Sequence, residues 1–313
     1  MSVTGVKREG AHACICHWRL RPDRPRSRRR ITAGHTVTGL ARSDAAAARL
    51  ESLGATPHRG SLDDLDSLRV GAEAADGVLH MAYGGDFSDL DDMMRRDRTA
   101  IEALGRPLEH SGKPLVITSG TLVMPADRET TEKDEPDTAG LAAFRIAGER
   151  ACLAFAARGV RASVVRLAPT VHGPEDHGFI PMLIATARKT GVSAYVGDGT
   201  NRWPAVHRLD AAVLFRLALE KAPAGSVLHG VAESGVTLKS IAETIARGLD
   251  LPTVSLTPAE AATHFVSPFM ATAYGFDGPV SSTHTQELLG WSPTHPTLLE
   301  SLEHGDYLAT PTA

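Results

Sequence analysis

The sequence is short of cysteine and contains no long apolar run. Only three of its 313 residues are cysteines, Cys14, Cys16 and Cys152. This is too few for a disulfide framework and is typical of a protein in a reducing cytoplasm, so we expect a cytoplasmic location. No apolar stretch approaches the roughly 20 residues that a membrane span needs. The first residues also lack an apolar core ahead of a small-residue cleavage site, so we expect no secretory signal.

Candidate metal ligands are equally sparse. The Cys-x-Cys formed by Cys14 and Cys16 lies close to His12 and His17, a combination that can bind zinc. No second pair of ligands follows at the spacing of a zinc site. We therefore expect no bound metal.

Positive charge is concentrated at one end of the chain. Residues 1–30 hold nine lysines and arginines against two acidic residues, Glu9 and Asp23, although the whole chain carries a net charge of −4. A basic arm of this kind suggests nucleic acid or a targeting segment. Because a nucleic-acid binder would rest on these residues alone, we expect neither a nucleic-acid partner nor a membrane partner.

From Ile31 onward, strand and helix patterns alternate regularly. Short β-branched runs end in turn residues, and helical stretches with capping residues follow; Asp44, for example, is placed to cap an alanine-rich helix. The expected strands cover residues 34–40, 56–59, 76–82, 115–118 and 162–167, and the expected helices cover 45–53, 93–104, 141–158, 181–190, 210–221 and 238–249. This alternation predicts an α/β fold with a doubly wound parallel sheet, the Rossmann fold.

The domain organisation follows from where this alternation holds. Residues 1–30 form an aberrant basic segment, and residues 31–173 are expected to form a dinucleotide-binding Rossmann domain. After Pro174 the alternation loosens, with more proline, histidine and glycine. Residues 174–313 are therefore expected to form mainly a smaller, mixed substrate-binding lobe with returning Rossmann elements.

The stretch from Lys113 to Gly120, Lys-Pro-Leu-Val-Ile-Thr-Ser-Gly, is the central strand of this prediction. A buried apolar run ends in hydroxyl side chains, those of Thr118 and Ser119. Ligands of open α/β sheets bind outside the carboxyl ends of the strands, so these two residues are candidate catalytic residues. A serine after a strand also simply begins many turns. The similar strands on both sides favour the functional interpretation.

Several motifs, in this order, resemble the extended short-chain dehydrogenase/reductase superfamily, specifically its NAD-dependent epimerase/dehydratase-like branch. They are Thr-Val-Thr-Gly-Leu-Ala-Arg-Ser (36–43), Gly-Ser-Leu-Asp-Asp (60–64), Val-Leu-His-Met-Ala (78–82), Val-Ile-Thr-Ser-Gly (116–120), Val-Val-Arg-Leu-Ala-Pro-Thr-Val-His-Gly-Pro (164–174), Val-His-Arg-Leu-Asp (206–210) and Leu-Gly-Trp-Ser-Pro (289–293). The resemblance covers Ile31 to about Tyr307. Each motif alone is weak, whereas the ordered set is strong.

The resemblance implies a dinucleotide bound across the sheet. An arginine after the second strand accommodates the 2′-phosphate of NADP, so NADP is the expected cofactor and NAD the alternative. The cofactor-binding residues that it implies are Arg42, Ser43, Leu62, Asp63, His80, Met81, Ala82, Pro169, Thr170 and Val171. Of these, Pro169 to Val171 match the backbone that holds the nicotinamide amide. Ser119 matches the catalytic hydroxyl, with Thr118 and Thr121 as neighbours.

The chain departs from the superfamily at the catalytic helix. The expected Tyr-x-x-x-Lys places a phenol and an ammonium one helical turn apart, so that the lysine lowers the pKa of the phenol. Here the matching pair is either Phe144 and Gly148 or Arg145 and Glu149. Arg145 is kept as a candidate catalytic cation, although with Glu149 it also fits an i,i+4 surface pair.

A substitute proton donor is therefore needed. Tyr83 and His172 both follow strands and are the two candidates, of which Tyr83 is placed among the catalytic residues. His177, Tyr195 and His207 are weaker candidates in the second half of the chain.

The second departure lies at the N-terminus. The first strand-to-helix turn of the superfamily carries Gly-x-x-Gly-x-x-Gly, whose glycines let the backbone approach the pyrophosphate. No such run exists between Met1 and Gly34. However, the codons for residues 12–18, read one base later, allow Met-Arg-Val-Phe-Val-Thr-Gly, and those for residues 19–24 allow Ala-Ser-Gly-x-Ile-Gly. The hypothesis is that residues up to about Ile31 are translated out of frame.

Two functions of different classes fit these features. The first is an NAD(P)-dependent oxidoreductase or epimerase-like enzyme that acts on a small hydroxyl- or carbonyl-bearing metabolite. The second is a non-catalytic NAD(P)-binding sensor, which the missing tyrosine and lysine would allow. The sequence does not identify the substrate. A homodimer is possible, but no sequence pattern indicates which face would form the dimer interface.

The frameshift hypothesis makes a prediction about the gene. Codons that encode the printed residues 12–24 should read, one base later, with glycine codons at the positions of the fingerprint. Sequencing of the genomic DNA and of the transcript tests this prediction. A shifted frame without those glycine codons contradicts the hypothesis, and the basic segment is then a genuine disordered tail.

Overall fold

A computed structural model describes residues 19–20, 35–83, 89–265 and 267–309. Most of the predicted fingerprint region, residues 12–24, and most of the loop after Tyr83 lie outside these ranges. The chain divides into two compact units. Unit 1 comprises residues 1–118, 147–164 and 219–226, and unit 2 comprises residues 119–146, 165–218 and 227–313. Each unit is therefore assembled from segments that lie far apart in the sequence.

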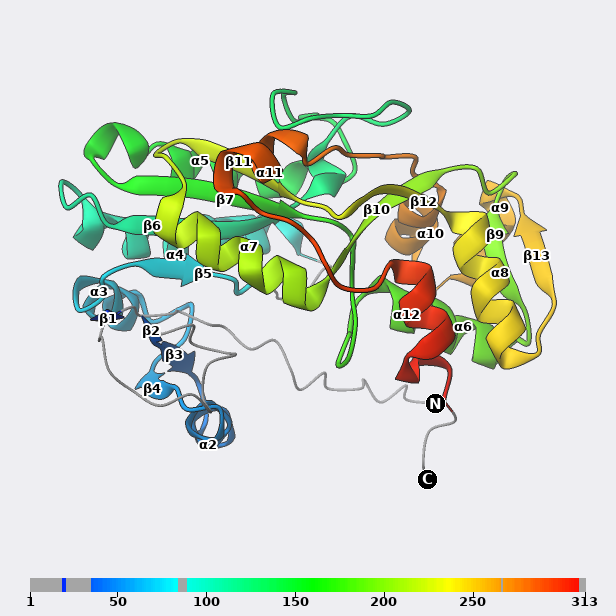
Figure 1. Cartoon of the computed structure of the whole chain (residues 1–313), viewed down its shortest axis with the longest axis horizontal. Helices are drawn as coiled ribbons and strands as arrows, with labels where there is room; N and C mark the ends of the chain where they lie inside the picture. The colour runs from blue at the N-terminus through cyan, green and yellow to red at the C-terminus, as the bar shows by residue number, and fades with distance from the viewer. Residues whose placement is uncertain (1–18, 21–34, 84–88, 266, 310–313) are drawn as a thin grey trace. The chain divides into compact units, whose positions relative to one another are not determined.

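Two strand pairs of unit 1 are parallel, as predicted. β3 (Thr38–Ala41) pairs with β4 (Thr56–Arg59), and β5 (Val78–His80) pairs with β6 (Pro114–Gly120). The larger sheet has the order β11-β7-β6-β5, where β7 is Arg161–Leu167 and β11 is Ser226–Gly230 (Figure 1). A short antiparallel pair joins β1 (Arg19–Leu20) to β2 (His35–Thr36). The predicted α/β class with a Rossmann sheet is confirmed.

The helices of unit 1 differ in how much they bury. They are α2 (Asp44–Ser52), α3 (Leu65–Glu73), α4 (Leu90–Gly105) with the 3₁₀ turn η2 (Arg106–Leu108), and α5 (Ile146–Leu153). α2 buries only Ala47, whereas α3 and α4 bury several apolar side chains. Leu68 of α3, Ile101 and Leu104 of α4, and Leu115 of β6 are completely buried in the core of unit 1. Burial of large aliphatic side chains is the main stabilising contribution to such a core.

Two local predictions need correction. Ser43, not Asp44, caps α2: its hydroxyl accepts a hydrogen bond from the Ala46 N–H at 3.2 Å, while Asp44 is the first helical residue. The expected helix over 141–158 is also much shorter. Only α5 is α-helical, and 3₁₀ turns η4 (Ala143–Arg145) and η5 (Ala156–Arg158) flank it. Gly148 within α5 lowers the helix propensity by about 1 kcal/mol, which weakens a long regular helix here.

Unit 2 is a mixed α/β structure. In one sheet β10 (Arg202–His207) runs parallel to β8 (Thr170–His172) and antiparallel to β12 (Glu233–Thr237). A second pair joins β9 (Ser193–Val196) to β13 (Thr253–Leu256). The helical elements are η3 (Thr121–Val123), α6 (Phe179–Thr190), α7 (Arg208–Lys221), α8 (Leu238–Leu249), α9 (Pro258–His264), α10 (Pro268–Gly275), α11 (Thr283–Leu289), α12 (Leu298–His304) and η6 (Asp306–Leu308).

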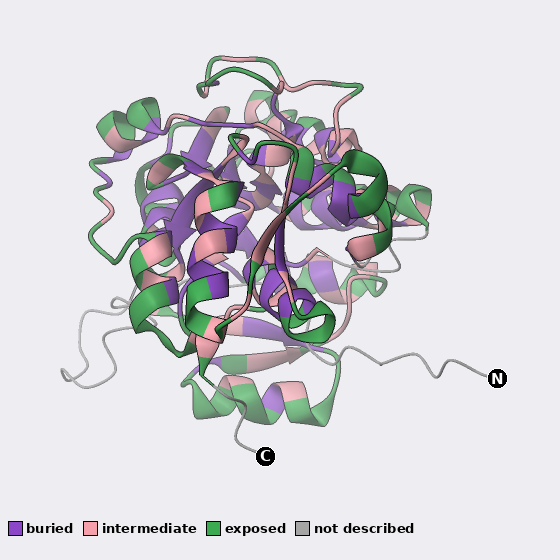
Figure 2. Cartoon of the chain, turned by 90° about the vertical axis from the view of Figure 1, so that its right-hand side faces the viewer, coloured by how far each residue is buried: buried purple, intermediate pink, exposed green. Residues whose placement is uncertain are grey.

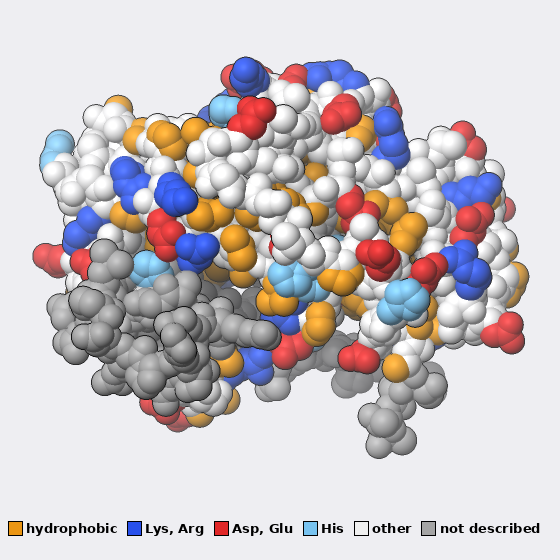
Figure 3. Space-filling view, in the orientation of Figure 1, with side chains coloured by type: hydrophobic (Ala, Val, Ile, Leu, Met, Phe, Trp, Pro, Cys, Tyr) orange, Lys and Arg blue, Asp and Glu red, His pale blue; other side chains and the backbone are white. Residues whose placement is uncertain are grey.

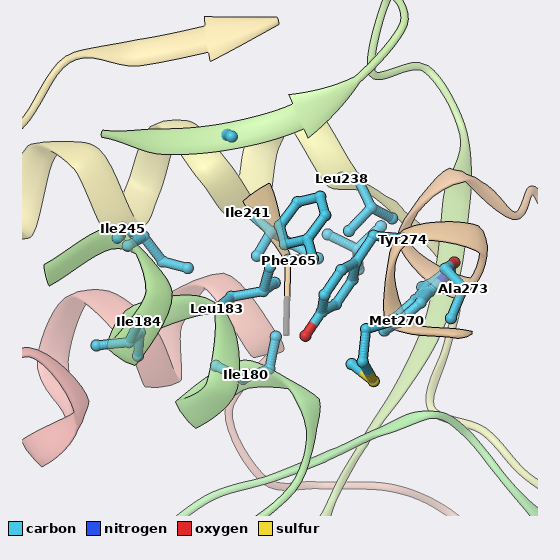
Figure 4. Close-up of a cluster of buried hydrophobic side chains, with 14 of the residues drawn as sticks. Ile180, Leu183, Ile184, Leu238, Ile241, Ile245, Phe265, Met270, Ala273 and Tyr274 are labelled. Carbon is cyan, nitrogen blue, oxygen red and sulfur yellow. The ribbon is translucent and has the colours of Figure 1, made fainter. Parts of the chain in front are cut away.

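The core of unit 2 forms where α6, α8 and α10 meet β9 and β10. Figure 4 shows Ile180 and Ile184 of α6, Ile241 and Ile245 of α8, and Tyr274 of α10 directed into one cluster. The Trp203 ring is fully buried and stacks on Tyr274 at 5.4 Å between ring centroids. In Figure 2 buried residues gather in the interior, and exposed residues lie mainly on the outer helices and loops.

The described residues contain neither a membrane-spanning helix nor a cluster of metal ligands. Within residues 19–20, 35–83, 89–265 and 267–309, no helix combines the length and apolarity that crossing a bilayer requires. The same residues contain no cluster of three or more histidine, cysteine or acidic side chains suited to a metal ion. On the face drawn in Figure 3, basic and acidic side chains are interspersed, so this face presents no field of a single sign.

The core of unit 2 yields a stability prediction. Ile241 on α8 is completely buried, so Ile241→Ala should lower the free energy of unfolding by about 2–5 kcal/mol through lost burial and the cavity left behind. Val213 on α7 is 37% exposed, and Val213→Ala should change that free energy by less than about 0.5 kcal/mol. Urea unfolding measures both. Equal effects of the two substitutions would contradict this description of the core.

Candidate cofactor and active site

In each parallel strand pair of unit 1, the register places the predicted site residues at the same carboxyl-terminal edge of the sheet. His80 of β5 lies opposite Ile117 of β6, so Met81 and Thr118 follow at the same carboxyl end. Met81 is 41% exposed, which is unusual for a large apolar side chain directly after a buried strand, whereas Ala82 is buried and Thr118 is half-buried. An exposed apolar side chain at this edge offers a contact surface to a ligand.

The residues predicted to contact the adenosine lie at the ends of β3 and β4. Ala41 lies opposite Arg59, so Arg42 and the loop after Arg59 leave the sheet at the same edge. Arg42 and Ser43 are exposed, and the Ser43 hydroxyl is engaged as the cap of α2. Arg59 forms an ion pair with Asp44. An exposed Arg42 beside a helix N-terminus is suited to an anionic group.

Asp63 and Leu62 belong to the loop after β4. Leu62 is half-buried, and the Asp63 carboxylate accepts two hydrogen bonds from Arg96 of α4, both at 2.7 Å. The Asp63 side chain is 61% exposed. An exposed ion pair of this kind contributes only about 0–1 kcal/mol, so it does not prevent Asp63 from binding a ligand.

Buried hydroxyl groups lie at and just after the carboxyl end of β6, at positions that belong to unit 2. Ser119 is 5% exposed and Thr121, at the start of η3, is 2% exposed. Neither hydroxyl has a hydrogen-bond partner among the residues that the structure describes. A buried polar group left without a partner costs about 1–3 kcal/mol. These two hydroxyls are therefore suited to hydrogen-bond a polar ligand.

The predicted nicotinamide-binding segment, Pro169–Val171, leads into β8. The Thr170 hydroxyl donates a hydrogen bond to the Pro204 carbonyl at 2.6 Å and is buried, so this side chain is committed to the fold. Pro169 and Val171 are half-buried. β8 and β10 are held in parallel register, with Thr170 opposite Ala205. The segment therefore offers backbone groups, rather than a titratable side chain, to a ligand.

Asp97 accounts for the missing lysine at position 148. A Cβ atom added to Gly148 would lie 2.5 Å from the Asp97 Oδ2 atom and 3.2 Å from Ile101. Asp97 projects from α4 and accepts a hydrogen bond from the His80 ring, Nε2 to Oδ1, at 3.1 Å. All of these groups belong to unit 1. No side chain larger than hydrogen fits at position 148 while Asp97 keeps this position.

His80 was predicted to contact the cofactor, and the structure places its ring in the interior. The residue is 2% exposed and its Nε2 atom is bound to Asp97. Asp97 itself was missed by the sequence analysis. The sequence did contain a signal for it, because Asp97 is an acidic residue within the apolar stripe of α4, between Met93 and Ile101. A carboxylate is rarely buried in a core without a partner, so its place in this stripe indicates a specific partner.

The expectation that Glu149 lies on the surface is wrong. Glu149 is only 2% exposed, because it lies on the inner side of α5. Burial, together with the negative charges of Glu149 and Asp97, raises the pKa of the nearby Cys152 thiol. Cys152 therefore stays a neutral core residue. Arg145 is half-buried in η4, and its catalytic role stays a prediction.

The two candidate proton donors differ in burial. Tyr83 is half-buried at the end of the described segment that follows β5. His172 is 1% exposed, and its Nδ1 atom lies 3.0 Å from the Ser301 hydroxyl. Burial and the neighbouring His207 lower the pKa of His172 to about 4. His172 is therefore neutral at pH 7 and bound into the interior of unit 2, which favours Tyr83 as the donor.

Of the three weaker candidates, His207 is 5% exposed, Tyr195 is half-buried and His177 is exposed.

Unit 2 also contains a cavity of about 650 Å³ with an acidic lining. Asp127, Asp198 and Asp277 contribute carboxylates, and Arg202 contributes the positive charge. Arg202 binds both oxygens of Asp277, at 3.0 and 2.8 Å, and the hydrogen bond from Arg202 lowers the pKa of that carboxyl. With its arginine already neutralised, this cavity disfavours an anionic ligand such as a diphosphate.

The parallel sheet and the strand-end residues define a dinucleotide-binding enzyme of the extended short-chain dehydrogenase/reductase type. The sequence profile of the NAD dependent epimerase/dehydratase family matches residues 27–229, which is more than half of the chain. The chain belongs to this family. Membership makes it an enzyme of nicotinamide chemistry and confirms the predicted superfamily.

Relatives support this assignment over nearly the full length. The uncharacterized protein C2A9.02 of Schizosaccharomyces pombe is 46% identical over 284 residues, covering 90% of this chain and 94% of that protein. The uncharacterized protein YLL056C of Saccharomyces cerevisiae is 42% identical over 274 residues, covering 87% and 91%. A ketoreductase of Stigmatella aurantiaca, acting on 4-hydroxy-2-methyl-3-oxo-4-farnesyl-3,4-dihydroquinoline-1-oxide, is 26% identical over 67% of this chain and 65% of its own.

Solved structures share the fold. MoeE5 in complex with UDP-glucuronic acid and NAD superposes with a TM-score of 0.69 at 22% identity, covering 88% of this chain and 91% of MoeE5. DesIV, a dTDP-glucose 4,6-dehydratase from Streptomyces venezuelae with NAD bound, gives a TM-score of 0.69 at 16% identity and 87% coverage of each chain. At these identities the likeness establishes the fold alone.

The tight contact at Gly148 yields a second stability prediction. Gly148→Ala should lower the free energy of unfolding by about 1–3 kcal/mol, because the methyl group displaces Asp97 from His80. Gly275→Ala is the matched control, since its Cβ would meet only Val196 at an ordinary 3.7 Å. Thermal unfolding of both variants checks the prediction. A Gly148→Ala protein as stable as the wild type would mean that Asp97 does not occupy this position.

Proposed function

We propose that the protein is an NADP-preferring oxidoreductase or epimerase-like enzyme that acts on a small hydroxyl- or carbonyl-bearing metabolite. The observation that carries the proposal is the pair of buried, unpartnered hydroxyls of Ser119 and Thr121, within the described residues, at the carboxyl end of β6. Ligands of open α/β sheets bind at that end of the strands. Family membership supports the nicotinamide cofactor in general.

The chain's residues would divide the work as follows. Arg42 and Asp63 bind the adenosine half of the cofactor, and the backbone of Pro169–Val171 holds the nicotinamide. The bound nicotinamide supplies hydride transfer. Ser119 donates a hydrogen bond to the reacting oxygen of the substrate and so stabilises negative charge that develops there. Tyr83, with Thr118 and Arg145 as further catalytic candidates, exchanges the proton that accompanies the hydride.

The preference for NADP rests on Arg42. Its exposed guanidinium directly follows β3, and no acidic residue occupies position 42 to bind a ribose 2′-hydroxyl. A guanidinium binds a phosphate through parallel hydrogen bonds, which an uncharged hydroxyl cannot match. NAD, which is bound in the MoeE5 and DesIV structures, is the alternative.

The acidic cavity bears on the class of substrate. We take this cavity as the substrate site; its three carboxylates and one neutralised guanidinium then favour a substrate without a diphosphate group. MoeE5 is a structure in complex with a UDP-sugar, and we therefore do not extend that substrate class to this chain. A small, uncharged or cationic metabolite suits such a lining better.

A non-catalytic NAD(P)-binding sensor is the second candidate function. The absence of a tyrosine and lysine pair, with Gly148 lying against Asp97, favours it. Oxidation of NADPH in the presence of a panel of small ketones and aldehydes separates the two functions. Turnover with any carbonyl supports the enzyme, while tight binding without turnover supports the sensor.

Cofactor binding tests the proposal directly. NADPH and NADH are titrated by fluorescence into the chain as printed and into a form whose first 31 residues are replaced by the shifted-frame sequence. We expect tight NADPH binding by the repaired form only. Arg42→Ser in that form should weaken NADPH binding by about tenfold or more and leave NADH binding unchanged, since only NADPH carries the 2′-phosphate.

Arg69→Ser, which removes an exposed arginine of α3 paired with Asp66, is the matched control and should bind NADPH normally. Binding of neither cofactor by either form would overturn the proposed function. Binding by both forms would retain the function and contradict the frameshift hypothesis.

A further inference from the structure

Hydrogen bonds join the end of β8 to the C-terminal part of unit 2. The His172 Nδ1 atom lies 3.0 Å from the hydroxyl of Ser301 on α12. The next residue, Gly173, donates its N–H to the Tyr307 hydroxyl at 2.9 Å, and that hydroxyl donates to Asp176 at 2.7 Å. Residues that follow the nicotinamide-binding segment are therefore held by side chains about 130 positions later in the sequence.

Three histidine rings lie in a row at this point. His172 of β8 and His207 of β10 are partners in the parallel register, and their ring centroids are 5.4 Å apart in an edge-to-face contact. His207 in turn stacks on His295 at 4.8 Å, with ring planes 7° apart. Asp210 holds the outer ring, since its carboxylate lies 2.7 Å from His295 Nδ1. Among the described residues, the side-chain hydrogen bond of Asp210 thus goes to His295 and not to His172 or His207.

Within the described ranges, no carboxylate is hydrogen-bonded to the rings of His172 or His207. The Leu209 N–H donates to His207 Nδ1 at 3.2 Å, so that nitrogen carries no proton. The Nε2 atom of His207 faces Gly173, where an added Cβ would lie only 2.7 Å away. The Nε2 atom of His172 is buried and has no hydrogen-bond partner in the described part of the chain. A charge on His172 would therefore be buried and uncompensated.

We propose that His172 is a positioning residue, whose neutral ring locks the nicotinamide-binding segment Pro169–Val171 to α12 and releases it on protonation. The inference rests on the proposed function, because it takes this segment as the nicotinamide contact. Protonation adds a positive charge beside His207 without a carboxylate in hydrogen-bond contact. The ring then leaves its place, and the end of β8 loses its tie to Ser301.

The charged and titratable groups around His172 favour the neutral ring. Burial of His172 is the main cause that lowers its pKa to about 4; His207 on β10 lowers the pKa further, and Asp210 on α7 raises it more weakly. Arg208 adds positive charge at the start of α7 and lowers the pKa of His207. Several other charged groups on the packed elements bind elsewhere: Asp176 to Tyr307, Glu233 to the Leu298 N–H, Glu300 to Thr297, Glu303 to Arg247 and Arg188 to the Ala309 carbonyl.

The sign of the pH effect follows from these groups. A released His172 has the ordinary histidine pKa of about 6.5 and takes up a proton that the locked ring does not. Acid between this value and about 4 therefore favours the released state. Cofactor binding, which needs the locked segment, should weaken over the same interval.

The test measures the dissociation constant of NADPH between pH 8 and pH 5 with the full-length protein, in whichever form binds NADPH. We expect wild-type affinity to fall by about tenfold between pH 7 and pH 5. His172→Asn keeps a polar atom toward Ser301 but does not titrate, so its affinity should change by less than about threefold. His264→Asn, which removes another histidine whose pKa burial lowers, should keep the wild-type profile.

Ser301→Ala is the second variant, in case His172→Asn does not fold, and it should weaken NADPH binding already at pH 7. Ring-proton NMR should show that His172 stays neutral down to pH 5 in the presence of NADPH. Identical pH profiles of wild type and His172→Asn, or unchanged binding by Ser301→Ala, would overturn the inference. Failure of the protein to bind NADPH at any pH would instead overturn the proposed function on which it rests.

Discussion

Hydrogen bonding between parallel strands is the constraint on which the site depends. Once Ala41 pairs with Arg59, and His80 with Ile117, the residues that follow each strand must leave the sheet at a common edge. No side-chain contact is needed to gather them. This explains how candidate ligands as far apart in the sequence as Arg42 and Asp63 share an edge, and why the chemistry lies in the loops rather than in the strands.

The same constraint explains what the sequence could predict. Residue patterns report local geometry, so the bounds of α8 and β4 and the strand that carries Thr118 were all predicted well. The cap of α2 was misplaced by one residue, because serine and aspartate cap helices almost equally well. The predicted helix over 141–158 was too long, since an apolar pattern does not distinguish α-helical from 3₁₀ turns.

Contacts between distant elements were beyond the sequence. Asp97 lies opposite Gly148 and His80 only because α4 and α5 pack on the same side of β5, and no spacing rule connects positions 97 and 148. Glu149 was taken for a surface residue for the same reason: helical spacing identifies a neighbour four residues away, but not which side of the helix is buried. The ties from Gly173 to Tyr307 are likewise set by the tertiary fold alone.

The exchange of a lysine for glycine changes what the catalytic helix can contribute. A lysine at position 148 would bring a positive charge to this part of unit 1, whereas Gly148 makes room for the negative charge of Asp97. A carboxylate does not lower the pKa of a phenol; it raises it. In the register that pairs Phe144 with Gly148, the lysine position therefore supplies no positive charge that could lower the pKa of a phenol, and proton transfer has to come from another part of the site.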